Sequence, residues 1–414
     1  MKILLLPSYF LPEGVSSPYI SWNRNQAFAD EGWNIVVYTP VPSRGITPEI
    51  RTEYKKKKLE VMFNGKMVVH RFNLIAEGKN PVIRAFRYFV QNIKQFCKAV
   101  FAKDGRSCDV MLIASTPPTQ GAMAVLIKFL TKKPLVYNLQ DIFPDSLVGA
   151  GMTRKGSLLW KVGRIIENFT YKYCDKIIVI SEGFKQNLLD KGVPKEKIEI
   201  IYNWVETNKI IPIAKEDNLL YREFGLDQNK FTVVYAGNLG NAQNIDIIVD
   251  AAVLLKHDKD IQFVIFGTGG LEESIRERIS SEHLVNMILL PLQSYERISY
   301  VYSLGDVCIV SCKAGLGGSA MPSKTWSIMS CGRPVVASFD EGELKDILES
   351  NDCGVFTQAG DLRGFVDAIK ILSANRERCV TMGMAGRKFI LDNLTKEVGT
   401  QKYVDVIKCV IENK

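Results

Sequence analysis

The residues whose types best suit a chemical role run from Pro322 to Ser338, in the sequence PSKTWSIMSCGRPVVAS. The pattern predicts a loop that enters an amphipathic helix at Ser323 and Lys324, a break at Cys331–Gly332, and then a short apolar strand. A helix N-terminus presents free N–H groups and the positive end of the helix dipole, and a lysine adds a full charge. We therefore expect an anion such as a diphosphate to bind at this loop.

A second segment, YAGNLGNAQNIDIIVDAA from Tyr235 to Ala252, has the pattern of a strand, a glycine-rich turn and a helix. Gly237 and Gly240 flank Asn238 in that turn. Their small size would let the backbone approach a phosphate closely, although a purely structural turn would need the same residues. Two phosphate-friendly turns in one half of the chain predict a site for a nucleotide diphosphate.

A third glycine cluster follows the predicted strand QFVIFG. Gly267 and Gly269 belong to the sequence GTGG, which is a weak signal by itself. Because the cluster lies at the end of a predicted strand, contact with a nucleotide and a plain turn are both open interpretations.

Two carboxylates flank the sequence IFP at the end of another predicted strand. Asp141 and Asp145 lie in the segment NLQDIFPDS. Either carboxylate could orient or deprotonate the hydroxyl group of an acceptor molecule. Either could instead cap a helix by accepting hydrogen bonds from its free N–H groups. The sequence leaves both interpretations open.

The loop after the first predicted strand carries Glu13 and Gly14, and the first predicted helix carries Arg24. A glycine in such a loop lets the backbone approach a diphosphate. Arg24 could reach a phosphate, although a solvated arginine is equally compatible with the pattern. We predict donor contact by Gly14 and acceptor contact by Glu13 and Arg24.

The elements that would position these residues alternate between short apolar strands and helices, which predicts an α/β chain with doubly wound parallel sheets. The first helix is expected at residues 19–32. Strands are expected at residues 2–6, 34–39, 66–72, 110–114, 134–138, 176–181, 232–236, 262–267, 287–291, 307–311 and 334–338.

The periodicity is lost near Pro212, which suggests a linker between two Rossmann-like domains. We expect an N-terminal domain at residues 1–205 and a C-terminal domain at 206–392, with a last helix at 393–414 that packs back on the first. Ligands of such folds bind at the carboxyl ends of the strands, here in a central cleft.

The composition is that of an ordinary globular protein, with 46% hydrophobic and 24% charged residues. No apolar stretch approaches the roughly 20 residues of a membrane-spanning helix. The start, MKILLLPSYF, is expected to be a buried strand and not a signal peptide. Nine scattered cysteines and three isolated histidines fit no usual metal site, so we expect reduced thiols and neither a metal nor another cofactor.

Charge is unevenly distributed along the chain. Residues 1–205 carry 30 Lys or Arg against 17 Asp or Glu, a net charge of +13, while the remainder is mildly acidic at −5. This asymmetry predicts an anionic partner for the first half, and by itself it leaves a membrane surface and a nucleic acid open.

The predicted helix Pro81–Phe101 combines apolar residues with Arg84, Arg87, Lys94 and Lys98. One interpretation is a core-facing helix with a solvated basic face. The other is a membrane-surface helix whose aromatic side chains enter the lipid interface while its basic side chains meet lipid phosphates.

Five segments in order carry a family resemblance: PSYFLPEG, NLQDIFPDS, DKIIVISEGFKQNLLDKGVPKEKIEIIYNWVE, YAGNLGNAQ and PSKTWSIMSCGRPVVAS. Together they resemble glycosyltransferase family 4, most closely the bacterial O-antigen and capsule branch with N-acetylfucosamine-type (aminodeoxysugar) transferases. The resemblance spans nearly the whole chain.

The resemblance implies a GT-B fold and a retaining transfer of a sugar from a UDP-sugar held by the C-terminal domain. It also implies an acceptor sugar on a polyprenyl diphosphate, held by the N-terminal domain. The protein would then lie on the inner face of the bacterial cytoplasmic membrane, with an anionic membrane surface and no nucleic acid as its partner. Among the donor-binding residues that it implies are Leu292, Met321, Pro322 and Ser323.

The chain departs from the family pattern in its charged residues. Asn238 and Gln243 stand where typical members carry an Arg and a Lys, and Ser319 and Ser327 stand where they carry two Glu. These polar side chains can still hydrogen-bond a donor, and Lys324 is the obvious substitute for the missing cations. Arg333 is a weaker candidate for the same role.

Three classes of function fit these observations. In a retaining transferase, Lys324, Ser323 and Gly14 would stabilise the diphosphate leaving group. A UDP-sugar epimerase of the same fold would need acid and base groups, and the scarcity of histidine argues against it. A non-catalytic partner subunit of a transferase is the third possibility, supported by the missing Glu pair.

Overall fold

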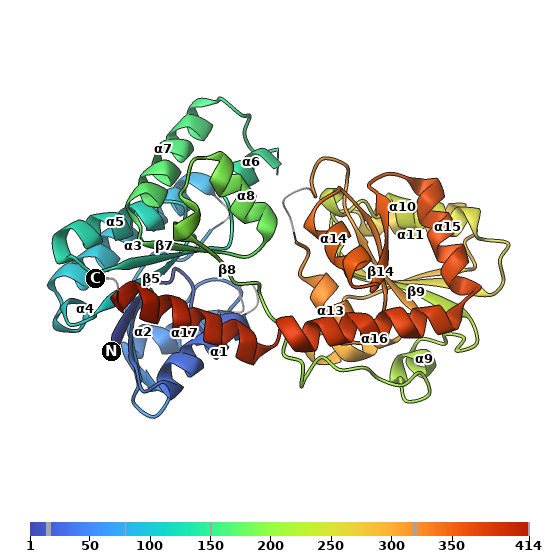
Figure 1. Cartoon of the computed structure of the whole chain (residues 1–414), viewed down its shortest axis with the longest axis horizontal. Helices are drawn as coiled ribbons and strands as arrows, with labels where there is room; N and C mark the ends of the chain where they lie inside the picture. The colour runs from blue at the N-terminus through green and yellow to red at the C-terminus, as the bar shows by residue number, and fades with distance from the viewer. Residues whose placement is uncertain (14–17, 79, 150, 318–320, 413–414) are drawn as a thin grey trace. The chain divides into compact units, whose positions relative to one another are not determined.

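The computed structural model describes the 414-residue chain except for residues 14–17, 79, 150, 318–320 and 413–414. The chain forms two compact units, which we describe separately. The first comprises Met1–Tyr202 and Gly399–Lys414, and the second comprises Asn203–Val398 (Figure 1).

The first unit is built on an eight-stranded sheet in the order β3-β4-β2-β1-β5-β6-β7-β8. Every pair of neighbours is parallel except β3 with β4. The chain starts at a central strand and adds strands on both sides, so the sheet is doubly wound. The strands are β1 (Lys2–Leu5), β2 (Asn34–Pro40), β3 (Leu59–Met62), β4 (Met67–Phe72), β5 (Val110–Ala114), β6 (Leu135–Leu139), β7 (Lys176–Val179) and β8 (Ile198–Ile200).

Helices connect these strands, and α5 packs between α3 and α7 on one layer (Figure 1). The helices of this unit are α1 (Pro18–Asp30), α2 (Pro48–Lys56), α3 (Pro81–Phe101), α4 (Lys103–Arg106), α5 (Gln120–Thr131), α6 (Asp145–Gly149), α7 (Leu158–Tyr173) and α8 (Glu182–Asp190). A short 3-10 helix, η1 (Lys195–Lys197), precedes β8.

The last helix of the chain, α17 (Lys396–Glu412), lies against this first unit. The Tyr403 hydroxyl donates a hydrogen bond of 3.2 Å to Asn138 Oδ1, at the end of β6. Lys408 Nζ forms an ion pair of 2.7 Å with Glu31, which follows α1. The C-terminal segment is therefore part of the first unit, although the whole second unit lies between it and the rest of that unit in sequence.

The second unit is built on a six-stranded, wholly parallel sheet in the order β11-β10-β9-β12-β13-β14. Its strands are β9 (Phe231–Asn238), β10 (Ile261–Thr268), β11 (Met287–Leu290), β12 (Val307–Ser311), β13 (Val335–Phe339) and β14 (Gly354–Gln358). Its helices are α9 (Leu219–Glu223), η2 (Asn241–Gln243), α10 (Asp246–Leu254), α11 (Glu272–Ser281), η3 (Tyr295–Arg297), α12 (Ile298–Ser303), α13 (Lys324–Ser330), α14 (Glu343–Ser350), α15 (Leu362–Ser373) and α16 (Arg376–Asn393).

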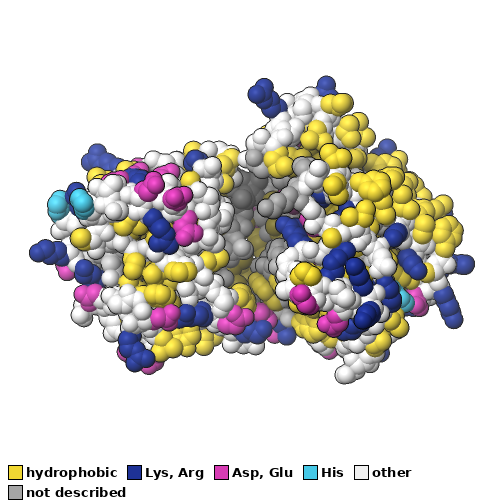
Figure 2. Space-filling model, turned by 180° about the vertical axis from the view of Figure 1, so that it is seen from behind, with side chains coloured by type: hydrophobic (Ala, Val, Ile, Leu, Met, Phe, Trp, Pro, Cys, Tyr) yellow, Lys and Arg dark blue, Asp and Glu magenta, His cyan; other side chains and the backbone are white. Residues whose placement is uncertain are grey.

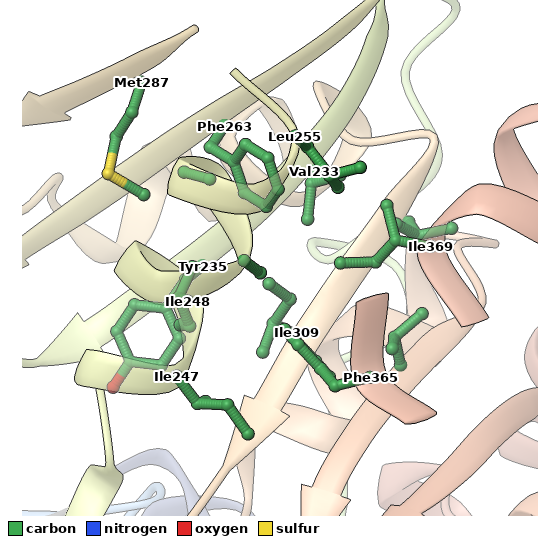
Figure 3. Close-up of a cluster of buried hydrophobic side chains, with 14 of the residues drawn as sticks. Val233, Tyr235, Ile247, Ile248, Leu255, Phe263, Met287, Ile309, Phe365 and Ile369 are labelled. Carbon is green, nitrogen blue, oxygen red and sulfur yellow. The ribbon is translucent and has the colours of Figure 1, made fainter. Parts of the chain in front are cut away.

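The core of the second unit forms where α10 and α15 cover the sheet (Figure 3). Phe263 of β10 and Ile309 of β12 are fully or almost fully buried there, together with Ile248 of α10 and Phe365 of α15. Apolar side chains on successive residues of these strands are buried because a parallel sheet is covered on both faces.

The prediction of two α/β, Rossmann-like sheets is confirmed. The structure adds β3, β8 and β14, which the sequence did not predict, and β3 is an antiparallel strand at the edge of the sheet. The sequence did not predict β3 because this strand has no run of buried apolar residues. Its inward residue is Glu60, which pairs with Arg71 at 2.6 Å, while Leu59 and Val61 are exposed.

Among the described residues, no helix combines the length and the apolar character needed to cross a membrane.

Candidate functional site

The strand order of the second unit points to one edge of its sheet. Sequential strands extend from β9 to β11 on one side and from β12 to β14 on the other, so the order reverses between β9 and β12. Doubly wound sheets bind ligands at the carboxyl ends of the strands beside such a reversal. Here β9 ends at Asn238 and β12 ends at Ser311, whose hydroxyl donates a hydrogen bond of 2.6 Å to the Gln243 carbonyl.

The structure brings the two predicted phosphate-friendly turns together at this edge. Gly237 has a φ of +147°, and a Cβ atom there would lie 2.8 Å from Lys324 Nζ. The lysine at the start of α13 therefore lies directly against the glycine turn after β9. A side chain at position 237 would displace the ammonium group, so the glycine is needed for this close approach.

The Lys324 ammonium group lies over an aromatic ring. Its Nζ is 3.9 Å from the centre of the Tyr235 ring, and the Tyr235 hydroxyl donates a hydrogen bond of 2.8 Å to the Asn238 carbonyl. Tyr235 is fully buried and belongs to the core shown in Figure 3. The face of the ring therefore contacts the ammonium group in favourable cation–π geometry.

Lys324 has no acidic partner among the residues that the structure describes. Burial lowers the pKa of its ammonium group to about 7. A partly buried cation without a counter-ion is unfavourable by itself, and an anion that binds beside it would relieve that cost. A strongly perturbed pKa at the carboxyl ends of such strands is typical of a functional group.

Amide side chains surround the same turn. Asn238 Nδ2 donates a hydrogen bond of 3.2 Å to Gln243 Oε1. A Cβ atom at Gly240 would lie 2.7 Å from the first amide and 2.8 Å from the second, so glycine permits their pairing. Each amide keeps further N–H donors, which are suited to the oxygens of a phosphate or a sugar.

The segment that leads into α13 also contributes polar groups. Met321 and Pro322 are partly exposed, and Ser323 is exposed. The Ser323 side chain makes no capping hydrogen bond to the helix. Ser327 lies one turn further along α13 and is partly exposed. Leu292, which follows β11, is exposed as well. These positions remain predicted donor contacts.

In the first unit, the Glu13 carboxylate binds backbone groups. Oε1 accepts hydrogen bonds from the Ser43 and Arg44 N–H groups at 2.7 and 2.9 Å, and Oε2 accepts one from the Phe10 N–H group at 3.2 Å. Glu13 is almost fully buried and joins the loop after β1 to the loop after β2. Its contact with an acceptor stays a prediction, and Gly14 lies outside the described residues.

Arg24 is buried against the C-terminal helix. Its guanidinium group lies 5.5 Å from the Tyr403 ring centre and donates hydrogen bonds of 3.3 and 3.1 Å to Asn25 Oδ1. Burial lowers the pKa of this guanidinium group. These contacts give Arg24 a role in holding α17, and its contact with an acceptor phosphate stays a prediction.

The two candidate carboxylates differ in their partners. Asp145 pairs with Lys191 at 2.8 Å and accepts a hydrogen bond from Asn187, and these contacts lower its pKa against the opposing effect of desolvation. Asp141 accepts a hydrogen bond of 3.2 Å from Ser146 and forms no ion pair among the described residues. Desolvation raises the pKa of Asp141. Asp141 is therefore the better placed of the two to accept a proton.

Comparison with known proteins identifies the family. The sequence model for Glycosyltransferase Family 4 matches residues 25–209, and the model for Glycosyl transferases group 1 matches residues 218–389. The chain belongs to the GT-B glycosyltransferases. The family resemblance that the sequence predicted is confirmed at this level.

Individual relatives and structures agree with this assignment. This glycosyltransferase is 22% identical to the probable glycosyltransferase WbjE of Pseudomonas aeruginosa over 339 residues, or 81% of each chain. Its fold resembles that of Anabaena HepE, solved in complex with UDP, with a TM-score of 0.73 and 16% identity over 99% of this chain and 100% of the other. It also resembles sucrose-phosphate synthase from Thermosynechococcus elongatus, with a TM-score of 0.76 and 16% identity over the full length of both chains.

Two of the predicted donor glycines in the glycosyltransferase have a clear packing role. A Cβ atom at Gly267 would lie 2.7 Å from the Gly237 carbonyl, and one at Gly269 would lie 2.6 Å from the Leu239 carbonyl. Both glycines let the end of β10 approach the turn after β9. They shape the site by packing, and direct contact with a nucleotide stays a prediction for them.

Asp340 is a residue of this site that the sequence analysis missed. Its carboxylate accepts hydrogen bonds from the Gly315 and Gly317 N–H groups, at 3.0 and 2.7 Å. It follows β13 directly, and its position at the carboxyl end of a strand was the signal that could have revealed it. Asp340 holds the start of the glycine-rich loop, whose continuation at 318–320, including Ser319, lies outside the described residues.

Arg333 binds carbonyl groups of its own unit. Its Nη2 donates hydrogen bonds to the Ser303 and Ile213 carbonyls, at 2.9 and 3.2 Å. This use of the guanidinium group supports a structural role, and it leaves Lys324 as the stronger candidate for binding a diphosphate. Among the described residues, no group of three or more His, Cys, Asp or Glu side chains could hold a metal ion.

Proposed function

We propose that this glycosyltransferase moves a sugar from a UDP-sugar to a lipid-linked saccharide, with retention of the anomeric configuration. The observation that carries the proposal is the cation without a counter-ion, Lys324, which lies against the Gly237 turn at the strand-order reversal of the second unit. The second unit would hold the donor and the first unit the acceptor.

The choice of UDP rests on the neighbouring fold. Anabaena HepE was solved with UDP, and it shares its architecture with this chain along almost the whole length. We extend that ligand to this chain because the diphosphate portion needs what the second unit offers, namely a cation and N–H donors at the end of β9. In the proposal, Leu292 and the glycines after β10 lie toward the nucleoside.

The chemistry follows from the charge that develops on the leaving group. As the bond between the sugar and the diphosphate breaks, negative charge grows on the phosphate oxygen. Lys324 and the amide groups of Asn238 and Gln243 would stabilise that charge, with the Ser323 hydroxyl beside them. A leaving phosphate on the same face of the sugar would accept the acceptor proton, which accounts for retention. The step needs little covalent participation by the protein.

The acceptor is proposed to be a saccharide on a polyprenyl diphosphate, as in O-antigen or capsule synthesis. The transferred sugar is proposed to be an N-acetylated amino or deoxy sugar, following the branch that the sequence resembles. Asp141 would orient or help to deprotonate the acceptor hydroxyl, supported by its position after β6 and its raised pKa. The basic first half would favour a location on the inner leaflet of a bacterial membrane.

The experiment is a binding screen followed by a transfer assay. UDP-, GDP- and dTDP-sugars are compared by thermal shift, because a ligand that binds only the native state raises its stability. We expect UDP-sugars to give the largest shift, and UDP release to begin only when a polyprenyl-diphosphate saccharide is added.

Other results would overturn the proposal. Isomerisation of the UDP-sugar without acceptor would indicate an epimerase. Binding without turnover in the presence of a range of lipid-linked saccharides would indicate a partner subunit. Preference for a GDP- or dTDP-sugar would reject UDP while leaving transfer itself in place.

A further inference from the structure

Helix α3 of the first unit faces the wrong way for an ordinary amphipathic helix. Most residues on its inner side are polar, and Arg87, Gln91 and Gln95 are all fully buried, while toward the C-terminal end Ala99 joins the core. Its outer side is apolar and solvent-exposed, with Val82 at 76% and Phe89 at 62% exposure. A helix on a soluble protein normally buries its apolar stripe. The core-facing interpretation is therefore wrong for the exposed apolar residues of α3, although its C-terminal end packs on the core.

The orientation of α3 is fixed by the hydrogen bonds of its buried polar side chains. Gln95 Nε2 donates hydrogen bonds of 3.0 Å to the Pro7 and Tyr38 carbonyls, next to the ends of β1 and β2. Arg87 Nε donates one of 3.0 Å to the Ile75 carbonyl. Turning the apolar side inward would break these bonds and leave buried polar groups unsatisfied, which is costly. The apolar side is thus held outward.

Helix α7 shows the same inversion. Its inner side carries Gly163, where a Cβ atom would lie 2.7 Å from the Phe143 ring, and the buried Glu167, which pairs with Lys191 at 2.9 Å. Its outer side carries exposed apolar residues, among them Leu158 at 80% and Ile165 at 68% exposure. Two helices of one unit therefore present their apolar sides to solvent.

Helix α5 packs between α3 and α7 and completes a continuous surface. Its ring of Phe129 meets Phe169 and Tyr173 of α7 edge-on, at centroid distances of 6.3 and 5.1 Å. We name this surface the outer face of α3, α5 and α7. Its exposed apolar residues are Val82, Ile83, Phe86, Phe89, Ile93, Phe101, Leu126, Phe129, Leu130, Leu158, Leu159, Val162 and Ile165.

Figure 2 shows hydrophobic side chains gathered over the first unit, at the right of the view, with Lys and Arg side chains around them. Soluble proteins rarely leave so many large apolar residues together, and such patches mark interaction surfaces.

The charge of this face indicates which kind of partner binds to it. Helices α3, α5 and α7 carry four, one and three basic residues and one acidic residue, the buried Glu167. Of the basic residues, Arg87 is buried, and Arg84, Lys128 and Arg164 pair with Glu77, Asp175 and Glu167. Lys98 and Lys161 are exposed and form no ion pair among the described residues. A second copy of the chain would bring an equally basic face against this one, which is unfavourable. An anionic lipid surface offers both an apolar interior and negative phosphates.

We infer that the outer face of α3, α5 and α7 docks on an anionic lipid bilayer, with its apolar side chains in the interfacial region and its lysines at the phosphate level. The inference deepens the proposed function by naming the surface that meets the membrane of the lipid-linked acceptor. The structure also changes which basic residues are expected to contact lipid. Arg87 is buried, and Lys94 donates a hydrogen bond of 2.7 Å to the Asn73 carbonyl.

The test is co-sedimentation of the full chain with phosphatidylglycerol–phosphatidylcholine vesicles, without donor or acceptor. One variant combines Phe86→Ser with Phe89→Ser, and another combines Leu158→Ser with Ile165→Ser. The control combines Val285→Ser, at a residue of the second unit that is 90% exposed, with the exposed Met384→Ser. We expect each α3 or α7 variant to bind about tenfold more weakly or worse, and the control to bind like wild type.

A second arm tests the charge. Lys98→Gln with Lys161→Gln should weaken binding to anionic vesicles several-fold, and added salt should weaken wild-type binding in the same way. Equal binding by all variants, or no binding by wild type, would overturn the inference. A wild-type dimer that only the serine variants convert to monomer would assign the face to a second copy instead. The UDP-sugar thermal shift, measured on every variant, reports separately on the proposed function.

Discussion

The two units share an α/β plan but leave different groups without partners. In the second unit, helices such as α10 turn their apolar side chains inward, and the unusual group is a cation, Lys324, without an acidic partner among the described residues. In the first unit, charged residues such as Glu13 and Asp145 have partners, and the unusual feature is the apolar outer side of α3 and α7. In our proposals, the second unit binds an anion and the first unit binds an extended surface.

The largest expected effect tests the contrast between the buried core of the second unit and the exposed apolar side of α3. Phe263→Ala, in the core of the second unit, should lower the free energy of unfolding by about 3–5 kcal/mol, because it removes a fully buried ring. Phe86→Ala on the outer side of α3 should change it by less than about 0.5 kcal/mol, because the ring is exposed. Chemical denaturation of both variants measures the difference. A large loss of stability for Phe86→Ala would show that the outer side of α3 is packed against other residues.

The next effect concerns the cation of the second unit. Lys324→Ala should remove roughly 2–4 kcal/mol of transition-state stabilisation, as expected for a lost electrostatic contact with a leaving group. Steady-state transfer kinetics measure the loss, with circular dichroism to confirm folding. Lys345→Ala is the matched control, because Lys345 pairs with Glu341 on the surface of the same unit. Wild-type turnover in the Lys324 variant would reject its role.

The third prediction separates the two carboxylates of the first unit. Asp141→Asn should reduce transfer by about 10²-fold with UDP-sugar affinity unchanged, if the carboxylate serves the acceptor. Asp145→Asn should chiefly affect stability, because Asp145 pairs with Lys191 at 2.8 Å. Transfer rates and melting temperatures of both variants distinguish these roles. Full activity in Asp141→Asn would favour a structural role for both residues.

The parts of the fold that the sequence predicted are those with a regular pattern. Strands β5 and β12 and helix α3 begin and end as predicted, because buried strands read as apolar runs and α3 begins at a proline. The joining of the Gly237 turn with Lys324 was predictable in outline, since parallel strands end at one edge of a sheet. The contact of the Tyr235 ring with the Lys324 ammonium group was not predictable, because it depends on side-chain conformation.

The orientation of α3 was beyond the sequence for a different reason. Its pattern shows two sides, and general experience places the apolar side inward. The partners that reverse it, the carbonyl groups of Pro7, Tyr38 and Ile75, belong to loops and strand ends whose positions no local pattern reveals. Glu13 and Arg333 could not be assigned from the sequence for the same reason. Each side chain has a type that suits a ligand, but each forms hydrogen bonds with backbone groups far along the chain.

The smallest expected effect is a pH dependence that belongs to the second unit alone. Burial lowers the pKa of Lys324 to about 7 in the free protein, and a bound diphosphate would favour the charged form and raise that pKa. Binding therefore takes up a proton above pH 7. The affinity for UDP-glucose should be highest below pH 7 and fall about tenfold at most for each pH unit above it, until the pKa of the bound state is reached.

Calorimetry at several pH values, in buffers of different ionisation enthalpy, measures both the affinity and the proton uptake. Lys324→Arg should bind with little pH dependence, because a guanidinium group stays charged throughout this range. Vesicle binding through the outer face of α3, α5 and α7 should not follow the same curve, since that face lies in the first unit and does not contain Lys324. If the affinity of the wild type for UDP-glucose changes as little with pH as that of the arginine variant, the ammonium group of Lys324 does not bind the diphosphate.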